Sequence, residues 1–142
     1  MKILVMVNIT KLQNSYLRIK DFINKTPILI SEKLNQDFNA SFYLKNEVEQ
    51  VTGSFKIRGA LSALSKLKEN NINGVVAYSS GNHAQGVSKA AQIFDMHAII
   101  VMPEDAPQNK IDKTLANGAE VVLYKRHIAV SYTHLTLPTI GC

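Results

Sequence analysis

Hydrophobic and polar positions from Gly53 onward follow a regular alternation of helix and strand patterns. Five apolar residues recur at helical spacing: Ile57, Ala60, Leu61, Leu64 and Leu67. They predict a helix that Ser54 caps and that ends at Asn70-Asn71. Strand, helix, strand, helix and strand patterns then follow over residues 75–78, 84–94, 97–102, 108–117 and 120–124. Short connections between such elements imply right-handed crossovers and predict a parallel three-layer α/β unit.

The N-terminal third has a weaker pattern. Apolar spacing over residues 15–24 predicts a helix that stops at Thr26-Pro27. A short apolar run covers 28–30, Ser31 is placed to cap a turn over 32–34, and residues 41–45 have the aromatic and apolar content of a strand.

Composition narrows the class of protein. The 142 residues are 46% hydrophobic and 19% charged, which fits one globular domain. The net charge of +5 comes from basic residues that acids interrupt, so we expect a solvated basic surface and no nucleic-acid partner. The single cysteine, Cys142, excludes a disulfide framework and a cysteine metal site, and favours a cytoplasmic location. The apolar run Met1–Val7 is too short to span a membrane, so no membrane partner is expected.

The loop from Ser79 to His83 is a candidate anion site. It leaves the carboxyl end of a predicted strand and enters a predicted helix, where backbone N–H groups and the positive helix end can hold a carboxylate or phosphate. Gly81 would let the backbone approach a ligand closely, and the neighbouring hydroxyls, amide and imidazole add polar groups. A capped turn with polar residues facing water is the alternative.

Lys56 is a candidate amine nucleophile. It falls in the first turn of a predicted helix, where the positive end of the macrodipole disfavours the ammonium form and makes the free amine available. Taken alone, an exposed surface lysine is the more common explanation.

The amino-acid sequences around Lys56 and in the loop 79–83 both resemble motifs of one enzyme family. Residues 54–60, preceded by Lys45, Glu47 and Gln50, resemble the Schiff-base lysine motif of the threonine dehydratase and serine racemase family of pyridoxal-phosphate enzymes. Residues 79–86 resemble the family's substrate-carboxylate loop. Further matches lie at Thr26-Pro27, Met102-Pro103, Ala106-Pro107 and Lys110, so that the resemblance covers roughly residues 23–126.

The resemblance implies a fold type II architecture and a role for each site residue. Lys56 would carry pyridoxal 5'-phosphate as an imine and then act as a base near Cα. Phe55 would pack on the cofactor ring, and Asn82 would approach its phenolic oxygen. The substrate carboxylate would be held by Ser79, Ser80, Gly81, Asn82 and His83. Ser80 also occupies the position of the second base in racemases of the family.

The implied function is a threonine or serine ammonia-lyase that gives a 2-oxo acid and ammonia. The cofactor acts as an electron sink when Cα–H is removed, and loss of the β-hydroxyl follows. A serine racemase and a non-catalytic truncated α/β fragment are the alternatives. The resemblance further implies a small amino-acid substrate and a homo-oligomer when full length, and no metal site is expected.

The chain also departs from the family. Its seven glycines are isolated, and no glycine-rich phosphate loop occurs. We therefore interpret it as an N-terminal part, in which residues 1–45 would join the large domain and residues 46–126 form the small domain with the lysine and the carboxylate loop. Residues 127–142 resemble translated sequencing adapter and are predicted to be a non-native tail, with an edge strand before a proline turn as the alternative.

Three charged residues around Lys56 are open to simpler interpretations. Arg58 could bind phosphate or form a structural salt bridge. Glu47 and Glu49 are interpreted as the surface of a loop and not as an acid–base pair.

Overall fold

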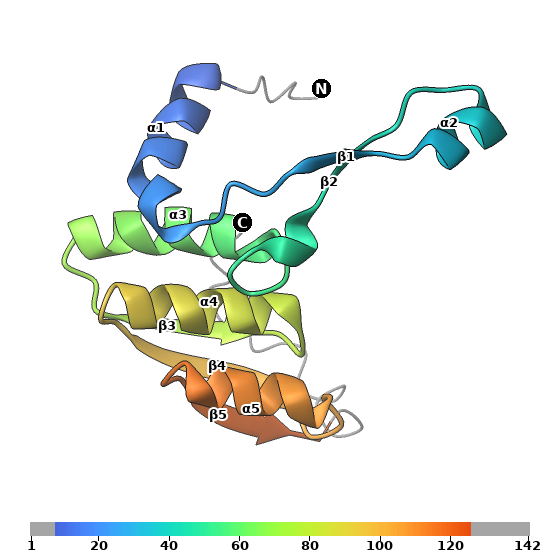
Figure 1. Cartoon of the computed structure of the whole chain (residues 1–142). Helices are drawn as coiled ribbons and strands as arrows, with labels where there is room; N and C mark the ends of the chain where they lie inside the picture. Colours follow the sequence, from blue (N-terminus) through green and yellow to red (C-terminus); the bar gives the residue numbers. More distant parts are fainter. Residues whose placement is uncertain (1–7, 126–142) are drawn as a thin grey trace, which may run out of the picture.

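The computed structural model describes residues 8–125. It consists of a body, in which helices stack on a three-stranded sheet, and an arm formed by residues 28–45 (Figure 1). Helix α1 (Ile9–Ile19) stands over α3 (Lys56–Glu69) at one end of the body. None of the helices in residues 8–125 is long and apolar enough to cross a bilayer.

The sheet of the body confirms the predicted alternation. Strands β3 (Gly74–Tyr78), β4 (His97–Pro103) and β5 (Glu120–Tyr124) lie in that order, and both neighbouring pairs are parallel. Helices α4 (Asn82–Ile93) and α5 (Gln108–Ala116) form the two crossovers. The carboxyl ends of β3 and β4 therefore lie at one edge of the sheet, where ligands of such folds gather.

The two faces of the sheet differ sharply. Val75, Ala98, Ile100 and Met102 point toward the helices and are buried, as the period of two along a strand requires. On the opposite face Val76 and Tyr78 are 58% and 61% exposed, and the Tyr78 ring contacts the ring of Tyr124 across β4. The second helical layer of the predicted three-layer unit is thus not formed by residues 8–125.

Helix α3 packs along α4 and completes the core. Ile57 and Leu61 of α3 are fully buried, together with Ile100 and Met102 of β4. Lys56 itself is exposed at the start of the helix, directly before the fully buried Ile57.

The N-terminal helix differs from its predicted bounds. It begins at Ile9, well before residue 15, because the Asn8 side chain caps it by accepting a hydrogen bond from the Lys11 N–H at 3.0 Å. It ends at Ile19 and continues as a 3₁₀ turn, η1 (Lys20–Phe22). The sequence pattern found the helix but missed its cap.

The arm is a two-stranded ribbon with a helix at its tip (Figure 1). Strands β1 (Ile28–Ile30) and β2 (Tyr43–Lys45) are antiparallel, and α2 (Glu32–Phe38) lies between them in the chain. Ser31 caps α2 as predicted, since its Oγ accepts a hydrogen bond from the Leu34 N–H at 3.3 Å. No residue of the arm is buried.

Candidate functional site

Lys56 is the first residue of α3, as the sequence predicted for the first turn. The prediction of Ser54 as its cap is wrong, because Phe55 occupies the cap position and no side chain caps the helix. Ser54 lies one residue too early for its hydroxyl to reach the first free N–H groups. Its Oγ is buried without a hydrogen-bond partner among the described residues, next to the candidate nucleophile.

Phe55 lies directly under the lysine. The Lys56 Nζ is 5.0 Å from the centre of the Phe55 ring, a cation–π geometry. The Phe55 side chain is 58% exposed, although phenylalanine side chains are more often buried. An aromatic face and an amine are thus presented together at the surface.

The predicted anion loop lies between β3 and the start of α4. Helix α4 begins at Asn82, so Asn82 and His83 belong to its first turn, and Gly81 at the cap position has no side-chain capping bond. The Ser79 Oγ accepts a hydrogen bond from the Gly81 N–H at 3.3 Å and shapes the turn. A Cβ placed on Gly81 would meet nothing within 4 Å, so the space beside this cap residue is open.

Close packing of α3 on α4 brings the lysine and the loop together. A Cβ on Gly86 would lie only 3.2 Å from the carbonyl carbon of Lys56 and 3.3 Å from the nitrogen of Ile57. Burial, and then the positive charge of Lys56, lowers the pKa of His83. The structure therefore places Lys56 and the start of α4 within electrostatic reach of each other.

Arg58 forms the structural salt bridge, with Glu47 as its partner. Its Nε and Nη2 donate to the two carboxylate oxygens of Glu47 at 2.8 and 2.7 Å. The hydrogen bond from Arg58 is the largest of the causes that lower the pKa of Glu47 to about 2. The interpretation of Glu47 as loop surface is therefore wrong. Its ion pair joins the segment before α3 to α3 itself, and no sequence spacing characteristic of a helix or strand predicts such a contact.

The same carboxylate anchors the base of the arm. Thr26, which precedes β1, is buried and donates its hydroxyl proton to Glu47 at 2.6 Å. Lys45 at the end of β2 donates to the carbonyl oxygen of Thr26 at 2.6 Å. We call Thr26, Glu47 and Arg58 the clamp, since together they connect both strands of the arm to the helix that carries Lys56.

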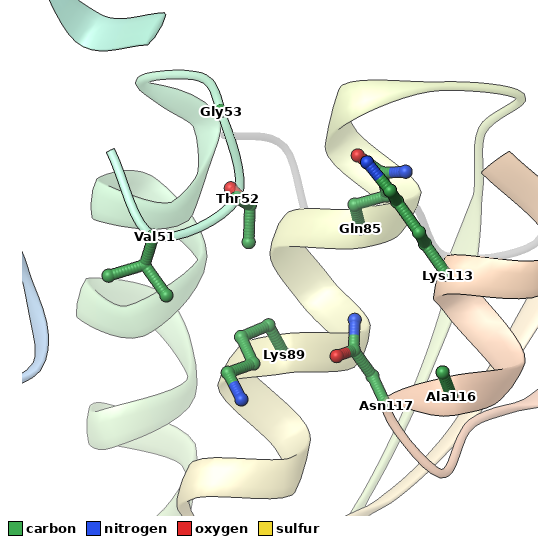
Figure 2. A pocket seen from close by; sticks show the side chains of 8 residues that line it. All are labelled: Val51, Thr52, Gly53, Gln85, Lys89, Lys113, Ala116 and Asn117. Atoms are coloured by element: carbon green, nitrogen blue, oxygen red, sulfur yellow. The ribbon is translucent and has the colours of Figure 1, made fainter. Parts of the chain in front are cut away.

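A cavity of about 320 Å³ lies between the loop that precedes α3, α4 and the C-terminal end of α5 (Figure 2). Its walls come from residues 51–53, from Gln85 and Lys89 of α4, and from the last turns of α5. The Thr52 Oγ1 and the Gln85 Nε2 are buried there without a hydrogen-bond partner among the described residues. Sequence analysis missed this cavity because its residues come from three separate segments with no common motif.

The geometry of lysine, aromatic ring and uncapped helix end suits an aldehyde cofactor and an anionic substrate. A family model described as pyridoxal-phosphate dependent enzyme matches residues 19–136. The chain belongs to this family. The match ends within the segment 127–142, which lies outside the described residues, so the prediction of a non-native tail stays a prediction.

Relatives within the family include ammonia-lyases and racemases. The chain is 48% identical over 111 residues to the L-threo-3-hydroxyaspartate ammonia-lyase of Saccharomyces cerevisiae and 47% identical over 111 residues to the serine racemase of Schizosaccharomyces pombe. Each match covers 78% of this chain and 34% of the relative. The L-threonine ammonia-lyase of Thermotoga maritima is 44% identical over 83% of this chain and 30% of that protein.

Solved structures agree on the fold. The serine racemase of Dictyostelium discoideum has a TM-score of 0.79 at 37% identity, covering 90% of this chain and 43% of that one. The processed form of threonine deaminase isoform 2 from Solanum lycopersicum has a TM-score of 0.69 at 38% identity, over 84% of this chain and 34% of that one. The fold is that of the fold type II enzymes, and the chain spans about a third of the length of the curated relatives it matches.

The residues present fit part of the cofactor. The exposed amine of Lys56, the open face of Phe55 and the unpaired Ser54 hydroxyl suit an aromatic aldehyde with polar substituents. The sequence contains no glycine-rich loop for the phosphate group, as its isolated glycines show. Within residues 8–125 no group of three or more His, Cys, Asp or Glu side chains is placed to hold a metal ion.

Proposed function

We propose that this chain carries the lysine and carboxylate-binding part of a pyridoxal-phosphate-dependent ammonia-lyase that acts on threonine or serine. One observation carries the proposal: Lys56 opens α3 beside the uncapped N-terminus of α4. A primary amine and an anion-binding helix end at this spacing match the amine and carboxylate chemistry of an amino acid. The threonine and hydroxyaspartate ammonia-lyases among the relatives support the reaction class.

Lys56 has two roles in this proposal. It would hold the cofactor covalently, and its amine would take the proton from Cα of the bound substrate. The bound cofactor supplies the electron sink that stabilises the resulting negative charge. Phe55 and Asn82 would hold the ring, by stacking and by a hydrogen bond to the phenolic oxygen.

The loop 79–83 orients the substrate. The N–H groups of the first turn of α4 and the Ser79 and Ser80 hydroxyls would bind the carboxylate, with His83 at the rear of the turn. A neutral His83, favoured by its lowered pKa, adds no second cation beside Lys56. Fixing the carboxylate aligns Cα–H with the amine, an orientation effect that can lower a barrier by about 7 kcal/mol or more.

A serine racemase is the second candidate. Ser80 stands in the carboxylate loop, with a hydroxyl that could exchange a proton on the face opposite Lys56. The serine racemases of Schizosaccharomyces pombe and Dictyostelium discoideum among the relatives support it. We further propose a homo-oligomeric, cytoplasmic protein whose small domain is formed by residues 46–126, with residues 1–45 joining a large domain.

Borohydride trapping tests the cofactor step. Wild-type chain incubated with pyridoxal phosphate and reduced should carry one irreversible adduct, which peptide mass spectrometry places on Lys56. Lys56→Ala should abolish that adduct, whereas Lys66→Ala, in the last turn of the same helix, should leave it unchanged. An adduct that persists at full yield in Lys56→Ala would contradict the assignment, and no adduct in the wild type would favour the non-catalytic fragment.

Product analysis tests the reaction. The protein that contains this chain is incubated with L-threonine and with L-serine, and 2-oxo acid and D-serine are measured separately. Formation of 2-oxo acid supports the ammonia-lyase, and D-serine without oxo acid supports the racemase. Ser80→Ala should suppress D-serine more than oxo acid, because only racemisation needs a base on the second face.

A further inference from the structure

Lys110 reaches from one crossover helix to the start of the other. It is the third residue of α5, and its Nζ donates to the Oδ1 of Asn82 at 2.9 Å. The same Nζ lies 3.5 Å from the Oε1 of Gln85, one turn further along α4. A half-buried lysine is thus held between two side-chain amides at the N-terminal end of α4.

The chemistry of the ammonium group decides how the Asn82 amide is oriented. A lysine ammonium has three donors and no acceptor, so it can contact the amide only through its oxygen. An asparagine side chain carries its acceptor on one side and its two donors on the other. With Oδ1 turned toward α5, the NH₂ group of Asn82 is turned away from Lys110.

We propose that Lys110 is a positioning residue that fixes the Asn82 amide with its NH₂ group available to the cofactor's phenolic oxygen. The inference rests on the proposed function, in which Asn82 contacts that oxygen. Without Lys110, the side-chain amide of Asn82 can rotate by half a turn. One of its two orientations would then place the amide oxygen against the anionic phenolic oxygen, which is unfavourable. Pre-organisation of the donor removes that unfavourable state before the ligand arrives.

The contact itself is testable without cofactor. Asn82→Asp places a carboxyl at the acceptor position, and a nearby ammonium stabilises its charged form. Carboxyl titration by NMR should give a pKa lower by about one unit in Asn82→Asp alone than in Asn82→Asp with Lys110→Met. Lys113→Met, the same change one turn further along α5, should leave the pKa of the introduced carboxyl almost unchanged. Equal values with and without Lys110 would overturn the inference.

The consequence for the cofactor is a separate measurement. Lys110→Met should raise the pyridoxal phosphate concentration needed for half-maximal borohydride trapping at Lys56 by about fivefold. It should also shift the absorbance of the bound cofactor toward the form with a protonated phenolic oxygen. Lys110→Arg, which keeps a cationic donor, should recover most of both effects, and Lys113→Met should show neither.

The two failures can be told apart. If the wild type traps cofactor at Lys56 but Lys110→Met has the same affinity and spectrum, the positioning role is refuted and the proposed function stands. If the wild type traps none, the proposed function fails, while the titration of the introduced carboxyl still decides whether Lys110 sets the orientation at position 82.

Discussion

The arm and the body are made from similarly apolar strands, yet only the body buries them. Ile30 of β1 is 62% exposed, whereas Ile100 of β4 is fully buried between the sheet and its helices. The arm meets the rest of the chain mainly at its base, through the clamp of Thr26, Glu47 and Arg58. The body thus carries its own core and the arm does not.

The buried core of the body stabilises the fold and also carries the candidate site, whereas the exposed strands of the arm are not part of that core. Lys56 and the anion loop both belong to the body, on helices that pack closely and whose inner faces are fully buried. Through the clamp, the base of the arm is joined to Arg58, in the first turn of the helix that begins at Lys56. Exposed apolar residues that lie together on a two-stranded ribbon are typical of a surface that contacts another polypeptide segment.

The largest expected effect comes from a matched pair of isoleucine truncations. Ile100→Ala removes fully buried methyl groups and should lower the free energy of unfolding by about 2–5 kcal/mol. Ile30→Ala, in the exposed strand of the arm, should change it by less than about 1 kcal/mol. Urea denaturation followed by circular dichroism measures both. Similar losses at the two positions would show that the arm has a core of its own.

A second pair probes the contact between α3 and α4. Gly86→Val forces a branched side chain against the backbone of Lys56 and should cost about 1–3 kcal/mol, while also lowering the yield of borohydride-trapped cofactor. Gly59→Val is the control, because a Cβ on Gly59, in the same helix as Lys56, meets nothing within 4 Å. Thermal unfolding and trapping yield are compared. Equal behaviour of the two variants would mean that α3 can move without consequence for Lys56.

The clamp predicts a pH-dependent contribution to stability. The pKa of Glu47 is about 2 in the folded chain against 4.5 ordinarily, so its contribution is present above pH 4.5 and is lost as the pH falls toward 2. Glu47→Gln should remove about 1–2 kcal/mol at neutral pH, allowing for solvent around the pair. Urea titrations between pH 7 and about pH 2 should then show a steeper acid loss in the wild type than in the variant. Parallel curves would refute the clamp.

The smallest effect concerns His83. Burial and the charge of Lys56 both lower its pKa, so Lys56→Met should raise the pKa only part of the way back, because the burial remains. NMR titration of the imidazole measures the change, with Lys66→Met as the control on the same helix. Since the folded pKa is lowered, the contribution of His83 to stability is present above pH 6.5 and declines as the pH falls below it. An unchanged titration in Lys56→Met would show that the two side chains do not interact.

Sequence reasoning predicted the body well because its elements are regular. The apolar spacing from Ile57 to Leu67 follows the helical period over several turns, and the segment of β4 is a short apolar run that Pro103 ends. The helix ends were harder to predict than the helices themselves. Asn8 caps α1 further toward the N-terminus than expected, and Phe55 instead of Ser54 occupies the cap position of α3. A cap depends on the backbone angle of one residue, which a periodic pattern does not determine.

Long-range polar contacts were the main omission. Glu47 and Arg58, or Asn82 and Lys110, are joined only after the chain has folded, and neither pair has a characteristic spacing. Lys56 and the loop 79–83 were singled out because each lies at a predicted helix start and because both segments resemble motifs of one family. Their mutual position depends on Gly86, whose role is visible only from the packing of two helices.

The rings of Tyr78 and Tyr124, tilted against each other, place two fluorescent side chains on the open face of the sheet. The sequence has five tyrosines and no tryptophan, so tyrosine dominates the intrinsic ultraviolet emission. The two phenols are hydrogen-bonded to each other on a face that water reaches. Whatever polypeptide covers that face alters their quenching and hydration, so the unlabelled chain can report its own assembly by fluorescence.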